Sequence, residues 1–251
     1  MIPHRKRAVF NWVFVAYARW LLRGHFHAIR ISGMEHAVAA LSAGPLVGIS
    51  NHSAWWDPIV LMWLSNYPFR RAVRSNGYAM MDAKNLKKLS FFRYLGVFGV
   101  SLDDAKDRAS VIPYAASLLE ESGDQVWLYP QGAERPITER PVRFRRGGAA
   151  IAHQAGVVVL PMALRYEHGK HPKPTCYLAF GEALPAIDGG EADVAAQEAA
   201  MERLLDHLGE AANAASRGAD PVPVALWGRR NPIAAFASNT LSRLTGRRPR
   251  Q

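Results

Sequence analysis

The segment SNHSAWWDP, residues 50–58, places a histidine and an aspartate five residues apart. His52 is able to accept a proton from a hydroxyl near neutral pH, and Asp57 is able to hold the required tautomer and stabilise the imidazolium that forms. The pair predicts general-base catalysis at a hydroxyl group. Such pairs also occur by chance in loops, and the alternative is that Asp57 caps a helix while His52 makes an unrelated hydrogen bond.

The flanking sequence places this pair between a strand and a helix. Gly44-Pro45 is a turn signal, and the apolar run from Leu46 to Ser50 predicts a buried strand. Asp57 and Pro58 are typical of a helix start, with an acid as N-cap and proline at the first position. We therefore expect residues 51–56 to form a loop that joins the strand to the helix.

Strands and helices alternate along the rest of the chain. This alternation predicts an α/β fold with a mixed, largely parallel sheet flanked by helices. Because Pro161 lies inside one apolar run, we expect that strand to be an edge strand or to end there. The expected strands cover residues 72–75, 125–129, 157–164 and 177–180, and the expected helices cover 108–121, 148–155 and 192–215.

The positive charge is concentrated at the two ends of the chain. Residues 1–34 and 221–251 each contain six basic residues and no acid. The chain has 31 basic and 21 acidic residues, so the part between these ends holds 19 basic against 21 acidic residues. Such ends attract nucleic acid or an anionic membrane surface. The apolar and aromatic residues interleaved with the charges favour the membrane, and no nucleic-acid-binding motif is present.

Residues 8–22 form an apolar run that only Asn11 and Arg19 interrupt. As a helix this run is about 22 Å long, which is short of the hydrocarbon core of about 30 Å. We expect a helix that lies in the membrane interface, although an ordinary buried helix is the alternative. Arg19 and the lack of a clear cleavage site argue against a secretory signal. The expected interface residues are Trp12, Tyr17, Arg19, Trp20 and Arg23.

These features predict three parts: an N-terminal membrane-interface helix over residues 1–29, a catalytic domain over 30–215, and a basic tail over 216–251. The tail contains a second basic amphipathic stretch. Cys176 is the single cysteine, so no internal disulfide forms. Neither a metal site nor a bound cofactor is predicted, and the sequence does not indicate an oligomeric state.

The histidine–aspartate segment resembles the histidine–four residues–aspartate (HX4D) motif of the glycerolipid (lysophospholipid) acyltransferase family, which includes the 1-acylglycerol-3-phosphate acyltransferases. Further segments resemble the later blocks of that family in the same order. The resemblance covers roughly residues 30–185. These later segments are FFRYLGVFGVSLDD (91–104), VWLYPQGAERP (126–136), VRFRRGGAAIAHQAG (142–156) and VVVLPMAL (157–164).

The resemblance implies an O-acyltransferase that moves a fatty acyl group from acyl-CoA or acyl carrier protein to a hydroxyl of a lipid acceptor. His52 would be the general base and Asp57 its orienting partner, without a covalent acyl-enzyme. Consistent with this, the chain has no Gly-x-Ser-x-Gly motif. The implied acceptor is lysophosphatidic acid or another lysolipid. The implied location is the cytoplasmic face of the inner (cell) membrane, with membrane lipids as partners.

The second and third blocks depart from the family pattern. Leu102 stands where an arginine usually closes the second block. In the third block Gln131 replaces a glutamate, Ala133 a threonine, and Glu134 an arginine, with Arg135 one residue later. A phosphate site requires fixed cations, so a non-phosphate acceptor is an alternative: a glycosylated or hydroxylated isoprenoid, or a lyso-aminolipid. A non-catalytic membrane-binding member of the family is the other alternative. The expected substrate-binding residues are Arg93, Gln131, Gly132, Arg135, Arg145 and Arg146.

Overall fold

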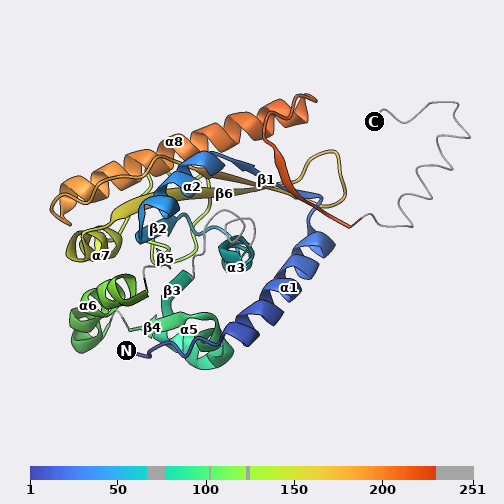
Figure 1. The fold of residues 1–251 in the computed structure, drawn as a ribbon. Coiled ribbons are helices and arrows are strands. Elements are labelled where there is room, and N and C mark those ends of the chain that lie inside the picture. The colour runs from blue at the N-terminus through green and yellow to red at the C-terminus, as the bar shows by residue number, and fades with distance from the viewer. Residues whose placement is uncertain (67–76, 102, 123–124, 230–251) are drawn as a thin grey trace, which may run out of the picture.

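The computed structural model describes residues 1–66, 77–101, 103–122 and 125–229. Within these residues, eight strands form one sheet in the order β4-β3-β5-β2-β6-β7-β1-β8 (Figure 1). The strands are β1 Ala28–Ser32, β2 Leu46–Ser50, β3 Gly77–Asp82, β4 Val97–Val100, β5 Gln125–Leu128, β6 Val158–Glu167, β7 Thr175–Phe180 and β8 Val224–Trp227. The helices are α1 Ala8–His25, α2 Met34–Ala43, α3 Asp57–Asn66, α5 Ala83–Lys88, the 3-10 helix η1 Ser90–Leu95, α6 Ala105–Ser122, α7 Gly147–Ala155 and α8 Glu191–Ser216.

The sheet is mixed and largely parallel, as the alternation of strands and helices predicts. Strands β4, β3, β5, β2 and β6 run parallel to one another. Strand β7 is antiparallel to β6 and parallel to β1, and β8 is antiparallel to β1. The carboxyl ends of β5, β2 and β6 therefore meet at one edge, where α/β proteins commonly bind ligands.

Helices cover both faces of the sheet, and alternate residues of each central strand point to opposite layers. Leu46 of β2 and Trp127 of β5 pack in one core with α1, α2 and α3. Val47 and Ile49 of β2 pack on the other face, in a core with α6 and α7. Helix α8 covers β6 and β7 on this second face (Figure 1). Strand β2, which carries the histidine loop, is thus buried along its whole length.

Strand β6 is not an edge strand, so the prediction drawn from Pro161 is wrong. It lies between β2 and β7 in the middle of the sheet. The carbonyl of Pro161 faces β7 and accepts a hydrogen bond from the Gly181 amide, just before the ladder with β7 begins at Met162. Because no partner strand needs a donor at that point, the missing N–H of proline costs no ladder hydrogen bond.

The other predicted elements form with small shifts at their ends, and the predicted strand over 72–75 lies outside the described residues. The region predicted as a tail contributes β8 to the sheet, so the sheet extends past residue 215. The remainder of that region, residues 230–251, lies outside the described residues, and it includes the whole of the second amphipathic stretch (232–244).

The N-terminal apolar run forms helix α1, which packs against α3 and η1. Before it, an extended segment pairs Ile2 with Gly99 of β4 and binds the η1 carbonyls of Arg93 and Tyr94. At its other end, the Arg229 amide donates to the Arg23 carbonyl. Within the described part of the chain, no helix has the length and apolar character needed to cross a membrane.

Candidate active site

The histidine loop follows β2 and is fastened to the neighbouring strand by Asn51. The Asn51 side chain donates to the Leu164 carbonyl (2.9 Å) and accepts from the Leu164 amide (2.7 Å). An amide side chain thereby replaces the next backbone pairing between β2 and β6. Asn51 is almost fully buried, so these bonds are shielded from water and fix the start of the loop.

His52 and Asp57 form a hydrogen-bonded pair. His52 Nδ1 lies 2.8 Å from Asp57 Oδ2, and the Asp57 side chain is completely buried. The same Oδ2 atom accepts the backbone N–H groups of Ser53 (2.7 Å) and Ala54 (3.0 Å). The carboxylate therefore binds the loop that precedes its helix. The alternative, in which Asp57 only caps its own helix and does not contact His52, is therefore wrong.

Tyr166 completes the set of donors around Asp57. Its hydroxyl donates to Oδ1 over 2.6 Å from the far end of β6. Burial raises the pKa of the Tyr166 phenol well above its usual range, and the nearby Cys176 and Asp57 raise it further. The phenol consequently keeps its proton at neutral pH and acts as a donor to the carboxylate.

Tyr129 packs flat against the imidazole of His52. The two ring centroids are 4.4 Å apart and the ring planes are inclined by only 21°. Burial, and then the charge of Asp57, raise the pKa of the Tyr129 phenol well above its usual range. With one ring face covered and Nδ1 bound to Asp57, the imidazole is held in one orientation, and Nε2 remains for a substrate.

The third block holds the backbone of His52 from both sides. Gln131 Oε1 accepts the His52 N–H (2.8 Å), and the Arg135 N–H donates to the His52 carbonyl (2.8 Å). Gln131 thus keeps the hydrogen-bond acceptor of the family's glutamate without its charge. Glu134 stands between Gln131 and Arg135 in the sequence, and its Oε1 lies 3.9 Å from His52 Nε2.

A cavity of about 310 Å³ with an arginine-rich lining adjoins this loop. Gly132 has a φ of 74°, and a Cβ there would lie 2.6 Å from Arg145 Nε, so only glycine lets that arginine lie across the turn. The structure therefore brings Gln131, Gly132, Arg135 and Arg145 together, and their role in substrate binding stays a prediction. The cavity is lined by Gln131, Arg135, Glu139, Pro141, Val142, Arg143, Phe144 and Arg145.

Two predicted substrate-binding residues lie elsewhere. Arg93 on η1 donates from Nε to the Pro3 carbonyl (3.0 Å), and Arg146 donates from Nε to the Gly189 carbonyl (2.7 Å). Neither lines the cavity, and both act as structural links between segments. Leu102, the altered residue of the second block, lies outside the described residues.

The predicted interface residues lie on α1 as a helical stripe. Trp12, Tyr17 and Trp20 are 66%, 48% and 53% exposed, which is unusual for such large apolar side chains. Arg19 is also exposed, whereas Arg23 is half-buried and donates to the Trp227 carbonyl (3.2 Å). The buried-helix alternative holds only for the opposite side of α1, where Ala18 and Leu22 are fully buried.

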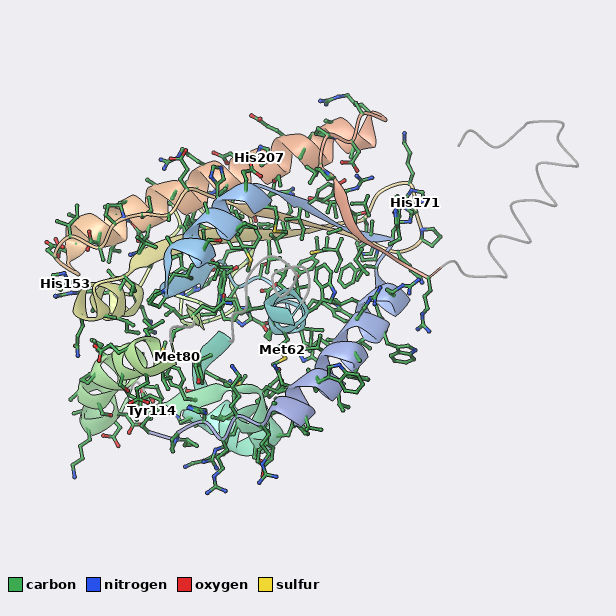
Figure 2. The ribbon with its side chains drawn as sticks, viewed as in Figure 1. Met62, Met80, Tyr114, His153, His171 and His207 are labelled. Atoms are coloured by element: carbon green, nitrogen blue, oxygen red, sulfur yellow. The ribbon has the colours of Figure 1, made fainter. Side chains whose placement is uncertain are left out.

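His153 and His171 do not extend the site. Figure 2 shows His153 on α7 and His171 in the loop between β6 and β7 at opposite ends of the molecule. Among the residues that the structure describes, no three His, Cys, Asp or Glu side chains gather as a metal site. Cys176 is fully buried, and burial raises the pKa of its thiol well above the usual range.

Sequence reasoning missed Asn51, Tyr129 and Tyr166. Asn51 and Tyr129 stand next to recognised residues, so their position directly after a strand was an available signal. Tyr166 lies 109 residues from Asp57 and belongs to no block. Only the parallel pairing of β6 with β2 brings it to the carboxylate.

The sequence and the fold were compared with known proteins. The family model described as Acyltransferase matches residues 28–165, which include the His52–Asp57 loop and nearly all of β6. A comparison with curated proteins finds no match. The crystal structure of PlsC, the 1-acyl-sn-glycerophosphate (LPA) acyltransferase from Thermotoga maritima, is similar with a TM-score of 0.56 and 16% identity, covering 80% of this chain and 78% of that one. That likeness concerns the fold, whereas the family match extends over more than half of the chain. The chain belongs to the acyltransferase family.

Proposed function

We propose that this enzyme transfers a fatty acyl group from a thioester donor, acyl-CoA or acyl carrier protein, to a hydroxyl of a lipid acceptor. The observation that carries the proposal is the 2.8 Å contact between His52 Nδ1 and a completely buried Asp57 carboxylate. This contact directs Nε2 of the same imidazole toward substrate. It is the arrangement that general-base catalysis at a hydroxyl requires.

In the proposed reaction, the acceptor oxygen attacks the thioester carbonyl carbon while His52 Nε2 takes the hydroxyl proton. The buried charge of Asp57 stabilises the imidazolium that forms. The tetrahedral intermediate then collapses, the C–S bond breaks, and Nε2 returns the proton to the leaving thiolate. The products are an ester and a free thiol, and no acyl group is attached to the protein.

The arginine-lined cavity supports a phosphate-bearing donor. Coenzyme A and the phosphopantetheine arm of a carrier protein both carry phosphate, which guanidinium groups bind by charge-assisted hydrogen bonds. Arg145 lies across Gly132, next to the Gln131 side chain that binds His52. A donor bound there would have its phosphates in the cavity and its thioester directed toward the imidazole.

The family, and the glycerophosphate acceptor that gives PlsC its name, support lysophosphatidic acid or another lysolipid as acceptor. Glu134, 3.9 Å from Nε2, favours the second candidate, an acceptor without phosphate. Both candidates use the same proton transfer by His52.

We also propose that α1 binds the cytoplasmic face of the cell membrane. Its exposed stripe of Trp12, Tyr17 and Trp20 has the composition of an interfacial helix, and Arg19 supplies positive charge for anionic lipids. Trp55, at 63% exposed in the histidine loop, contacts Trp56, which packs against His25 at the end of α1. This continuity would keep the loop close to lipid.

A thiol-release assay on detergent-purified protein tests the proposal, with palmitoyl-CoA and palmitoyl-acyl carrier protein as donors. We expect release that depends on a hydroxylated lipid and falls by about 10³-fold or more in His52→Ala, because the base is lost. Product analysis should find the acyl ester of the acceptor. Absence of release with every donor and acceptor, together with intact binding to vesicles, would instead support the non-catalytic member.

A further inference from the structure

The imidazole of His52 offers one nitrogen to the acceptor. Its Nδ1 is bound to Asp57 Oδ2 at 2.8 Å, so the acceptor proton must go to Nε2. A hydroxyl that transfers its proton there lies within about 3 Å of that nitrogen. The side chains next to Nε2 are therefore neighbours of the acceptor's head group.

Glu134 is such a neighbour. Its Oε1 lies 3.9 Å from Nε2, too far for a direct hydrogen bond and close enough for one hydroxyl to contact both atoms. Among the described residues, Glu134 and Asp57 are the two acids that approach this imidazole. Because Asp57 is completely buried behind the ring, Glu134 is the one that is able to contact an acceptor.

The position of Glu134 is fixed by its backbone. Gln131 and Arg135 on either side of it are both bonded to the backbone of His52 at 2.8 Å. Its side chain is 58% exposed, so it has room to turn toward a bound head group. The backbone of Glu134 thus stays near Nε2, and its side chain is able to rotate toward a bound head group.

The cations of the site lie in the cavity. Arg143 and Arg145 line it, and Arg135 lines it beside Glu139, its partner at 3.6 Å. Positive charge is therefore available for the donor's phosphates, whereas the acceptor meets a carboxylate. This separation of charge favours different head groups on the two substrates.

We propose that Glu134 selects the acceptor, and the inference rests on the acyl transfer proposed above. The favoured acceptor is a phosphate-free lipid whose reacting hydroxyl has a neighbouring hydrogen-bond donor, either a second hydroxyl or a protonated amine. Glu134 accepts a hydrogen bond from that donor group. A phosphate beside the reacting hydroxyl would instead place negative charge against the carboxylate.

The test compares kcat/KM for three acceptors with palmitoyl-CoA as the common donor. Lysophosphatidic acid and monoacylglycerol differ by the phosphate alone, and a lyso-aminolipid supplies the amine. The proteins are wild type, Glu134→Gln, Glu134→Arg, His52→Ala and Glu210→Gln. The last makes the same change of charge at an exposed position on α8, which covers the other face of the sheet.

We expect wild type to prefer a phosphate-free acceptor by about tenfold or more, and the ratio of the two phosphate-free acceptors identifies the donor group that Glu134 binds. Glu134→Gln should reduce this preference by about tenfold, Glu134→Arg should reverse it, and Glu210→Gln should leave it unchanged. A wild-type preference for lysophosphatidic acid overturns the inference and leaves acyl transfer standing. Equal losses for all acceptors in Glu134→Gln, or no loss of preference, also overturn it. Absence of His52-dependent transfer to every acceptor overturns the proposed function as well.

Discussion

Tyr166 and His52 bind opposite oxygens of the same carboxylate. Tyr166 donates to Asp57 Oδ1 at 2.6 Å, and His52 Nδ1 lies 2.8 Å from Oδ2. The carboxylate is therefore held from both sides, by the imidazole on one oxygen and by a neutral donor from β6 on the other.

Tyr166→Phe removes this hydrogen bond and keeps the ring. The Asp57 carboxylate then loses its hydrogen bond on Oδ1 and orients His52 less firmly, so kcat/KM should fall by about tenfold. Tyr177→Phe is the matched control, since its hydroxyl bonds to Asp220 on the other face of the sheet. Unchanged activity in Tyr166→Phe would mean that Tyr166 contributes packing alone.

Gln131 should be replaceable by glutamate and not by leucine. Gln131→Leu leaves the His52 N–H without its acceptor and should lower kcat/KM by about 10- to 100-fold through a misplaced imidazole. Gln131→Glu retains an oxygen at the same place and should keep most of the activity. Steady-state kinetics, with thermal unfolding to verify the fold, make the comparison. An equal loss of kcat/KM in both variants would show that the hydrogen bond from the His52 N–H does not determine the activity.

Vesicle sedimentation examines the role of α1. The double variant Trp12→Ala/Trp20→Ala should bind vesicles containing one quarter anionic lipid at least tenfold more weakly, roughly the effect of removing two aromatic side chains from the interface. High salt should also weaken the binding of the wild type to these vesicles, because part of the attraction is ionic. Ile187→Ala, at another exposed apolar position, is the control. If it weakens binding as much as the double variant, α1 is not the contact surface.

The stability of the fold should decrease in acid partly through His27. This ring stacks on His171 with 3.5 Å between centroids, and burial, then His171, Arg30 and Lys173, lower its pKa from 6.5. A lowered folded-state pKa means that the unfolded chain binds the proton first, so stability is present above about 6.5 and declines as pH falls.

His27→Gln should therefore lose less Tm between pH 7.5 and 5.5 than wild type. His4, whose pKa is also lowered mainly by burial, should keep part of the loss in place. His153→Gln, exposed on α7 (Figure 2), should match the wild type. Identical acid losses in all three proteins would remove His27 from this explanation.

Local patterns predicted the elements that local forces determine. The run Leu46–Ser50 and the helix start at Asp57 follow from turn signals and apolar residues that are adjacent in the chain. The prediction of an edge strand from Pro161 was wrong because it considers a single residue. The place of β6 between β2 and β7 depends on the pairing of the whole sheet. The same limit applies to the site. The contact between Tyr166 and Asp57 joins residues 109 apart, and no spacing within a motif encodes it.

The proximity of Glu134 to His52 was hidden for a related reason. In sequence, Glu134 is only a departure from a family pattern. Its distance to Nε2 becomes visible once the backbone bonds of Gln131 and Arg135 join two segments that are far apart in the chain. The chemical effect of a substitution in the third block can therefore be inferred only when the position of the His52 loop is known.

Helix α1 is hydrogen-bonded to the rest of the domain at both ends. The segment before it pairs Ile2 with Gly99 of β4, and after it the Arg229 amide is bound to Arg23. A helix held in this way is not a hinged anchor that lets the domain rotate freely above a surface. Any bilayer that binds its stripe would also set the tilt of the sheet, so that lipid head groups approach the histidine loop from one fixed direction.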